Sequence, residues 1–170
     1  NGHKVGTDKW RYKLEWYGRL ASWLAAHDKD QPLVLCGDFN IAPTNKDVAN
    51  LEEFEGSVLF NPEIVAKLEA LLEWGLSDVF RIHRPDDDAY SWWDYRRGGF
   101  ERNNGMRIDL ILTSKPVTDN AVASFIDVDE RQPESDQEGT HLIGEKPSDH
   151  APVLLAFKPV EKNLVQGALL

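Results

Sequence analysis

The chain has 170 residues, enough for one domain with a buried core, and its composition is that of a globular protein. Its net charge of −10 argues against nucleic-acid binding driven by total charge, although a local basic face is compatible with it. No apolar run is long enough to span a bilayer and no signal peptide is visible, so we expect a cytoplasmic protein without a membrane partner.

Two amphipathic helices are predicted in the first half. Thr7 and Asp8 can cap a helix whose apolar side chains recur at the spacing of one buried face: Trp10, Leu14, Tyr17, Leu20, Ala21 and Leu24. A second helix begins at Asn61-Pro62-Glu63, with proline at the first helical position, and should end at Gly75.

Between these helices, residues 33–36 form an apolar run that is too short for a helix and predicts a fully buried strand. The run ends at Cys36, the single cysteine of the chain. It cannot form a disulfide within the chain, so we expect a buried thiol in a reducing compartment.

Four further strands are predicted, over residues 90–95, 107–113, 121–128 and 152–157. Long polar loops, residues 96–105 and 129–148, separate the first pair and the last pair of these strands. Strands mixed with two long helices indicate a layered α/β domain. We expect this domain to cover residues 1–158, followed by a tail over residues 159–170 with no assigned role.

Charge is segregated along the chain. Residues 127–138 hold six acids and one arginine. Between Tyr95 and Arg107, by contrast, a single acid accompanies four arginines: Arg96, Arg97, Arg102 and Arg107. The second segment is the candidate for a local basic face.

The segment Gly37-Asp38-Phe39-Asn40 directly follows the strand predicted over residues 33–36. Strand alternation turns Asp38 and Asn40 to the same side, which sets a carboxylate beside an amide. The carboxylate can bind Mg²⁺ or orient an attacking water, and the amide can donate to a phosphoryl oxygen. The alternative is an Asx-turn at the strand end, for which both residue types are suited.

Asp109 lies within an apolar strand, where a carboxylate needs a partner, and His150 of Ser148-Asp149-His150 is a suitable one. The alternative for Asp109 is a strand-edge position paired with Arg107 or another base. Asp149 can bind a metal and His150 can contact a phosphate, whereas the alternative for this segment is loop capping by Ser148 and Asp149.

Ser91-Trp92-Trp93-Asp94-Tyr95-Arg96 concentrates aromatic side chains beside the arginine-rich loop. Alternation sends one tryptophan into the core and the other to the opposite face, where an indole could stack on a base or a sugar. Packing in the core alone is the alternative for both.

These segments, in this order, resemble the exonuclease III/abasic-site endonuclease family of the endonuclease/exonuclease/phosphatase superfamily. The similarity runs from about residue 8 to about residue 158 and includes residues 74–81, 91–96 and 146–153. It implies the C-terminal part of a four-layer α/β/β/α sandwich with mixed, largely antiparallel sheets.

The resemblance also implies roles for individual residues. The catalytic set would be Asp38, Asn40, Asp109 and His150. The ligands of Mg²⁺, or of Mn²⁺ as a substitute, would be Asp38, Asn40 and Asp149. The DNA contacts would come from Trp92, Arg96, Arg97 and Ile108.

The expected activity is that of a Mg²⁺-dependent DNA repair nuclease, with 3′–5′ exonuclease activity and cleavage 5′ to abasic sites in double-stranded DNA. The family's first half supplies a metal-binding Glu, an Asn and a phosphate-contacting Tyr that have no counterpart here, so we expect a monomer that needs this half for a complete site. Two alternatives are a superfamily phosphatase or phosphodiesterase acting on a small or lipid phosphate, and a non-catalytic structural half-domain.

Overall fold

Three antiparallel strands form the central sheet of the computed structural model, which describes residues 3–133 and 146–158. β3 (Asp109–Ser114) lies in the middle, between β1 (Val34–Asp38) and β2 (Leu76–Asp78). The register places Asp38 opposite Asp109 at one end of the sheet. Two carboxylates that are 71 positions apart in the sequence are therefore neighbours because of the strand pairing.

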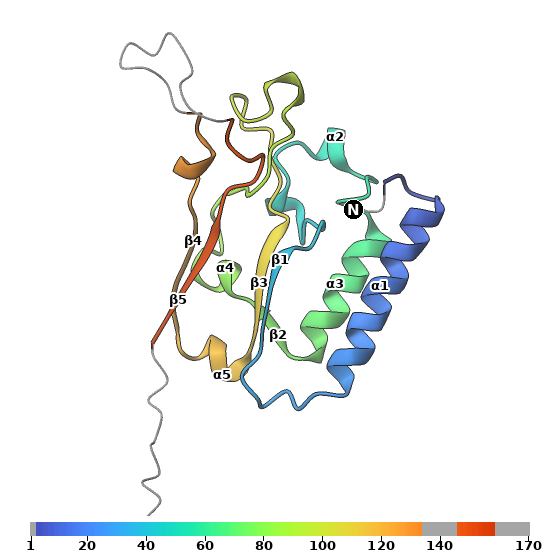
Figure 1. Ribbon diagram of the computed structural model, residues 1–170, viewed down its shortest axis with the longest axis vertical. Coiled ribbons are helices and arrows are strands. Elements are labelled where there is room, and N and C mark those ends of the chain that lie inside the picture. Colours follow the sequence, from blue (N-terminus) through green and yellow to red (C-terminus); the bar gives the residue numbers. More distant parts are fainter. Residues whose placement is uncertain (1–2, 134–145, 159–170) are drawn as a thin grey trace, which may run out of the picture.

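Two long helices, α1 (Asp8–Ala25) and α3 (Pro62–Trp74), cover one face of this sheet, as Figure 1 shows. Both begin where the sequence predicted, and α3 also ends where it was predicted to end. Thr7 accepts a hydrogen bond from the amide of Trp10, and Asn61 accepts one from the amide of Glu63. α3 ends at Gly75, whose φ of 131° favours glycine.

The main core fills the space between the helices and the sheet. Its buried side chains come from α1, α3, β2 and β3, and include Trp10, Tyr17, Leu24, Ile64, Leu68, Leu71, Leu76, Leu110 and Leu112. The apolar stripes predicted for the two helices therefore face the same sheet, and their burial is the main stabilising contribution in this half of the molecule.

A second, two-stranded antiparallel sheet, β4 (Ala121–Ile126) and β5 (Val153–Phe157), lies on the other side of the central sheet (Figure 1). The remaining helical segments are short: η1 (Asn45–Asp47), α2 (Leu51–Phe54), α4 (Val79–His83), η2 (Arg96–Gly98), α5 (Lys115–Thr118) and η3 (Asp129–Arg131). The α/β class is confirmed, and the described strands pair in antiparallel fashion.

The prediction of a strand over residues 90–95 was wrong. Trp92 makes isolated bridges to Met106 on one side and to His150 on the other, and the chain then turns into η2. A single bridge on each side does not extend into a ladder, although the alternating pattern resembles that of a strand. The three-residue β2 was not predicted, because so short a strand has no readable periodicity.

The prediction of a buried strand and a buried Cys36 was also wrong. Cys36 is exposed, and most of β1 is exposed with it. Among the described residues β1 pairs only with β3, so its outer edge is open. Apolar composition predicted burial, but burial also requires a covering element.

Arg107 does not belong to the basic face to which the sequence assigned it. Its side chain is 0% exposed and binds Asp47 at 2.6 Å and Asp78 at 2.6 Å. Arg81 binds the same Asp47. These four side chains form a buried ion network below the sheet end, and the basic face is left to the loop over residues 96–105.

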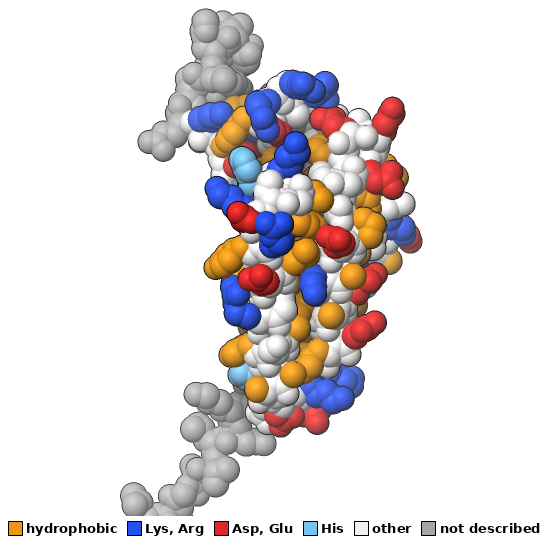
Figure 2. Space-filling model, turned by 90° about the vertical axis from the view of Figure 1, so that its right-hand side faces the viewer, with side chains coloured by type: hydrophobic (Ala, Val, Ile, Leu, Met, Phe, Trp, Pro, Cys, Tyr) orange, Lys and Arg blue, Asp and Glu red, His pale blue; other side chains and the backbone are white. Residues whose placement is uncertain are grey.

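The side of the molecule that carries α1 is shown in Figure 2, where hydrophobic side chains are interspersed with charged ones. Within residues 3–133 and 146–158, no helix is long and apolar enough to cross a membrane. The tail over residues 159–170 and residues 134–138 of the acidic segment lie outside the described part.

Candidate active site

Asp109 and His150 form the centre of the candidate site. Asp109 is the first residue of β3, and His150 lies shortly before β5. His150 Nδ1 is 2.8 Å from Asp109 Oδ2, and the side chains are 30% and 18% exposed. The predicted contact between them is thereby confirmed, and the alternative pairing of Asp109 with Arg107 is not observed, because Arg107 binds Asp47 and Asp78.

The pKa of His150 is raised above its ordinary value of 6.5. The hydrogen bond to Asp109 is the largest cause; burial opposes it, and the negative charges of Asp109, Asp38 and Asp149 add to it. Near neutral pH this imidazole is therefore cationic more often than a free histidine. Asp109 occupies Nδ1, which leaves Nε2 for a ligand.

Ser91 supports this pair and was not predicted from the sequence. Its hydroxyl donates to Asp109 Oδ2 at 2.7 Å and accepts from the amides of Ile108 and Asp109 at 3.1 Å each. Ser91 is fully buried, so water does not compete for these bonds. The sequence carried no signal for it beyond its place next to Trp92.

The segment from Asp38 to Asn40 is an Asx-turn, as the alternative interpretation proposed. Asp38 Oδ1 accepts from the amide of Asn40 and Asp38 Oδ2 accepts from Asn40 Nδ2, both at 2.7 Å. Asn40 has a φ of 52°, in the left-handed region. The same turn sets the carboxylate and the amide side by side, so both interpretations describe this segment.

α1 holds this turn from behind. Lys13 Nζ donates to the carbonyl oxygens of Asn40 and Val58, each at 2.6 Å, and the Tyr17 hydroxyl donates to the carbonyl oxygen of Phe39. Burial lowers the pKa of Lys13 to about 8, and the charge of Asp38 opposes this shift. The long helix therefore fixes the backbone that carries Asp38 and Asn40.

The pKa of Asp38 is raised above its ordinary value, first because neighbouring groups desolvate part of its carboxyl group although the residue remains exposed. The amide of Asn40 opposes this shift, the charge of Asp109 adds to it, and the charge of His150 opposes it. Two carboxylates with one histidine beside them are thus electrostatically coupled. Such coupling is frequent at catalytic sites.

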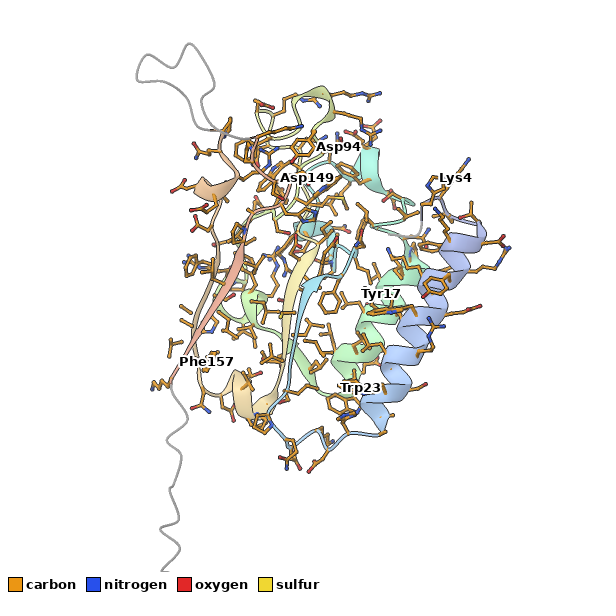
Figure 3. All side chains as sticks on the ribbon, in the orientation of Figure 1. Lys4, Tyr17, Trp23, Asp94, Asp149 and Phe157 are labelled. Carbon is orange, nitrogen blue, oxygen red and sulfur yellow. The ribbon has the colours of Figure 1, made fainter. Side chains whose placement is uncertain are left out.

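Asp149 joins the cluster from the segment before β5. Its Oδ2 accepts from Trp92 Nε1 at 3.0 Å, and its carbonyl oxygen accepts from the amide of Trp93 at 3.0 Å. The amide of His150 donates to Ser148 Oγ at 3.1 Å, so the loop capping by Ser148 that the alternative interpretation proposed is also present. Figure 3 shows Asp149 near Asp94, at the same end of the molecule.

Of the two tryptophans, Trp93 is buried and Trp92 is half-buried, as alternation predicted. The predicted direct contact of Ile108 with DNA is corrected. Ile108 is 2% exposed and lies in a core cluster against which Trp92 packs. It can support the indole from behind, but its side chain is not available to a ligand.

The arginine-rich loop is exposed at the same end. Arg96 binds Asp94, and its side chain is 85% exposed, while Arg97 is exposed with a φ of 59°. Together with Arg102, both line a small hollow of about 260 Å³.

Two larger hollows lie beside the cluster. One, of about 490 Å³, is bordered by Asp109, His150, Ser148 and Cys36. The other, of about 460 Å³, is bordered by Asp38 and Asn40 together with side chains of α1: Lys9, Tyr12, Lys13, Trp16 and Tyr17. Asp38 and Asn40 thus border one open hollow, and Asp109 and His150 border the other.

The described residues do not by themselves fit a divalent cation. No group of three or more His, Cys, Asp or Glu side chains within residues 3–133 and 146–158 is arranged to hold an ion. Both oxygens of Asp38 accept from Asn40, and Asp149 Oδ2 accepts from Trp92. The hard oxygen donors that such a cation prefers are present, but the set is incomplete.

Comparison with known proteins decides the family. Residues 6–150 match the Endonuclease/Exonuclease/phosphatase family. The chain belongs to this family. It is 37% identical over 158 residues to "Exodeoxyribonuclease III" of Haemophilus influenzae, and the match covers 88% of this chain and 55% of the relative. It is 32% identical over 151 residues to "Exodeoxyribonuclease" of Bacillus subtilis, with 88% and 54% covered.

Solved structures agree with this assignment. An AP endonuclease from Archaeoglobus fulgidus superposes with a TM-score of 0.82 at 32% identity, covering 93% of this chain and 58% of that one. The 3′ phosphatase NExo from Neisseria, bound to a product DNA hairpin, gives a TM-score of 0.80 at 31% identity, with 93% and 58% covered. The chain therefore spans little more than half the length of these relatives.

Proposed function

We propose that this chain forms the C-terminal part of a divalent-metal-dependent DNA nuclease. The complete protein would hydrolyse phosphodiester bonds, cutting 5′ to abasic sites and removing nucleotides from 3′ ends. The observation that carries the proposal is the hydrogen bond between Asp109 and His150, which lies beside Asp38 at one end of the central sheet, in a chain of this family. The base Asp38, the cationic His150 and the amide donor Asn40 could there act on one phosphate.

Each residue has a role that follows from its contacts. His150, held through Nδ1 and more often protonated than a free histidine, offers Nε2–H to a phosphoryl oxygen. Asn40 uses one amide hydrogen on Asp38 and keeps a second for the substrate. Asp38, whose pKa is raised, is a stronger base toward water than an ordinary aspartate.

We propose Mg²⁺, with Mn²⁺ as a substitute, as the cofactor of the complete protein. When bound, such an ion would neutralise charge on the phosphate. Asp38, Asn40 and Asp149 would contribute ligands, and the remaining ligands would come from outside the described residues.

The substrate assignment rests on Trp92, Arg96 and Arg97. Trp92 presents a half-buried indole beside Asp149, and the two arginines are exposed in the loop that follows it in the chain. The indole would accept a sugar that lacks its base, while the arginines would bind phosphates of double-stranded DNA. The chain carries a net charge of −10, so this local face must provide the attraction.

The rest of the domain is the partner that the site requires. β1 has an open outer edge among the described residues, and the chain spans 54–58% of the relatives compared above. We propose that the missing half covers this edge and completes the site, in a monomeric cytoplasmic protein whose domain includes residues 1–158.

The test compares four substrates: a duplex with an abasic analogue, a duplex with a recessed 3′ end, a duplex with a 3′ phosphate, and an inositol phosphate. They are incubated with Mg²⁺ and either the 170-residue chain or the whole protein to which it belongs. We expect the whole protein to cleave the first two substrates, and its Asp109→Asn variant to lose this activity. The control is His27→Ala, which changes an exposed histidine outside the site and should keep the activity.

The same experiment separates the alternatives. Turnover of the inositol phosphate without cleavage of DNA would favour a small-molecule phosphatase. Removal of the 3′ phosphate alone would indicate the activity named for the Neisseria relative. A whole protein that is inactive on all four substrates would leave a non-catalytic half-domain.

A further inference from the structure

One hydrogen bond joins two residues to which the proposed function gives different tasks. Trp92 is proposed to contact the sugar, and Asp149 is proposed to bind the metal. The indole Nε1 of Trp92 lies 3.0 Å from Asp149 Oδ2. Within the described residues, no other side chain donates a hydrogen bond to the carboxylate of Asp149.

The backbone reinforces this contact. Trp92 bridges to His150, the amide of Trp93 donates to the carbonyl oxygen of Asp149 at 3.0 Å, and the amide of Ala151 donates to the carbonyl oxygen of Ser91 at 2.8 Å. The segment over residues 91–93 therefore holds the main chain of residues 149–151 and the side chain of Asp149.

Trp92 itself is well supported. Its ring packs against a cluster of Ala42, Val48, Met106 and Ile108, in which each residue is at most 5% exposed. Its backbone exchanges reciprocal hydrogen bonds of 2.9 Å with Met106. A donor fixed in this way defines where one carboxylate oxygen lies, and a hydrogen bond to an ionised acceptor is stronger than one between neutral groups.

We propose that Trp92 is a positioning residue for Asp149. Its N–H fixes Asp149 Oδ2, so that Oδ1 faces the ligand side of the cluster. The functional consequence of this contact rests on the proposed function. The Trp92 side chain that contacts the sugar also orients the Asp149 carboxylate, so recognition of the substrate is coupled to the placement of Asp149.

The chain offers a matched control. Trp93, the next residue, donates Nε1–H to Asn103 Oδ1 at 3.2 Å, away from the cluster. Trp16 and Trp23 are each 45% exposed on α1 and provide reference indoles. A change from tryptophan to phenylalanine removes one N–H and keeps an aromatic ring, so the two neighbouring positions can be compared directly.

The first experiment is nuclear magnetic resonance on the full 170-residue chain. We expect the indole hydrogen of Trp92 to exchange at least about tenfold more slowly than those of Trp16 and Trp23, because it is hydrogen-bonded. Trp92→Phe should shift the side-chain carboxyl carbon signal of Asp149, and Trp93→Phe should not. If Trp93→Phe fails to fold, Asn103→Gly removes the same bond without strain, since Asn103 has a φ of 50°.

Either of two outcomes would overturn the proposal: exchange at Trp92 as fast as at Trp16 and Trp23, or an Asp149 carboxyl signal that Trp92→Phe leaves unchanged. Both measurements are independent of nuclease activity, so they can succeed where the proposed function fails.

The second experiment measures kinetics of the whole protein on abasic and intact duplexes. Trp92→Phe should keep the preference for abasic DNA and lower kcat about 10- to 100-fold, as expected when a supporting residue of a ligand is removed. Trp92→Ala should lose the preference as well. An unchanged kcat in Trp92→Phe would disprove the coupling, whereas a wild-type protein that cleaves no DNA would instead refute the proposed function.

Discussion

Asp47 and Arg107 form an ion pair of 2.6 Å in which both side chains are 0% exposed. Arg107 also binds Asp78, and Asp47 also binds Arg81, so no charge of this network is left without a partner. Arg107 is two residues before Asp109, and its amide donates to the carbonyl oxygen of Asp47. The network thereby anchors the start of β3, where the candidate site begins.

Replacing Asp47 by Ala should therefore destabilise the protein strongly. The change deprives the buried Arg107 of one of its two carboxylate partners, and breaking such a pair costs about 3–5 kcal/mol. Urea unfolding of both proteins measures this difference. Asp86→Ala is the control, because Asp86 pairs with Lys46 on the surface, where water screens the attraction and the pair should contribute far less to stability. Equal effects of the two changes would contradict the structural role of the network.

Ser91→Ala should lower stability by about 1–3 kcal/mol, the range for leaving buried polar groups unpaired. The change removes the donor to Asp109 and the acceptor of two buried amides. Urea unfolding checks the stability. Ser77→Ala, at a half-buried serine of β2, is the comparison, and a loss at Ser91 no greater than at Ser77 would exclude a special role for Ser91.

Asp109→Asn should lower the pKa of His150. The hydrogen bond to the Asp109 carboxylate is the largest cause of the raised value, and an amide carries no charge to replace it. Imidazole signals followed over a pH series measure the shift, with His27 as an internal reference outside the site. A pKa of His150 that stays raised in the variant would assign the effect to Asp38 and Asp149 instead.

The same pair has a predictable effect on stability. Because the folded pKa of His150 lies above its unfolded value of 6.5, the stabilisation is complete below pH 6.5 and is lost as the pH rises through the folded pKa. The stability difference between wild type and Asp109→Asn should accordingly be larger at pH 6 than at pH 9.

Replacing Arg96 and Arg97 together by Ala should weaken binding of the whole protein to duplex DNA by a similar factor for all sequences. It should flatten the dependence of log affinity on log salt by up to about two units, one for each phosphate that an arginine no longer neutralises. Binding titrations at several salt concentrations give this slope. Arg11→Ala with Arg19→Ala, on α1, changes the net charge equally and should leave the slope closer to that of wild type.

The 170-residue chain alone should bind Mg²⁺ weakly. Within the described residues the oxygen donors Asp38, Asn40 and Asp149 form an incomplete set, since no three acidic, histidine or cysteine side chains are arranged around an ion. Calorimetric titration with Mg²⁺ checks this, and Asp149→Ala reports on the contribution of one ligand. Tight binding by the wild-type chain would show that the site needs no further residues.

The sequence predicted those features that depend on local chemistry. The periodicity of α1 and α3, their Thr7 and Asn61 caps, and the contact of Asp109 with His150 are all present. Its errors concern neighbours that are distant in the sequence. Arg107 was placed on a basic face because its partner Asp47 lies 60 positions away, and Cys36 was placed in the core because nothing in the sequence tells which face is covered.

The open edge of β1 has a consequence for any preparation of this chain alone. A strand with unpaired amide and carbonyl groups on one side is a template for a further strand, and exposed Val34 and Cys36 make it apolar as well. Self-association through β1 would then compete with the docking of the remaining part of the domain proposed above. Gly37 lies in the same strand and directly precedes Asp38. A strand that binds at this edge would therefore also constrain the Asp38 carboxylate, so that assembly would determine the geometry of the site.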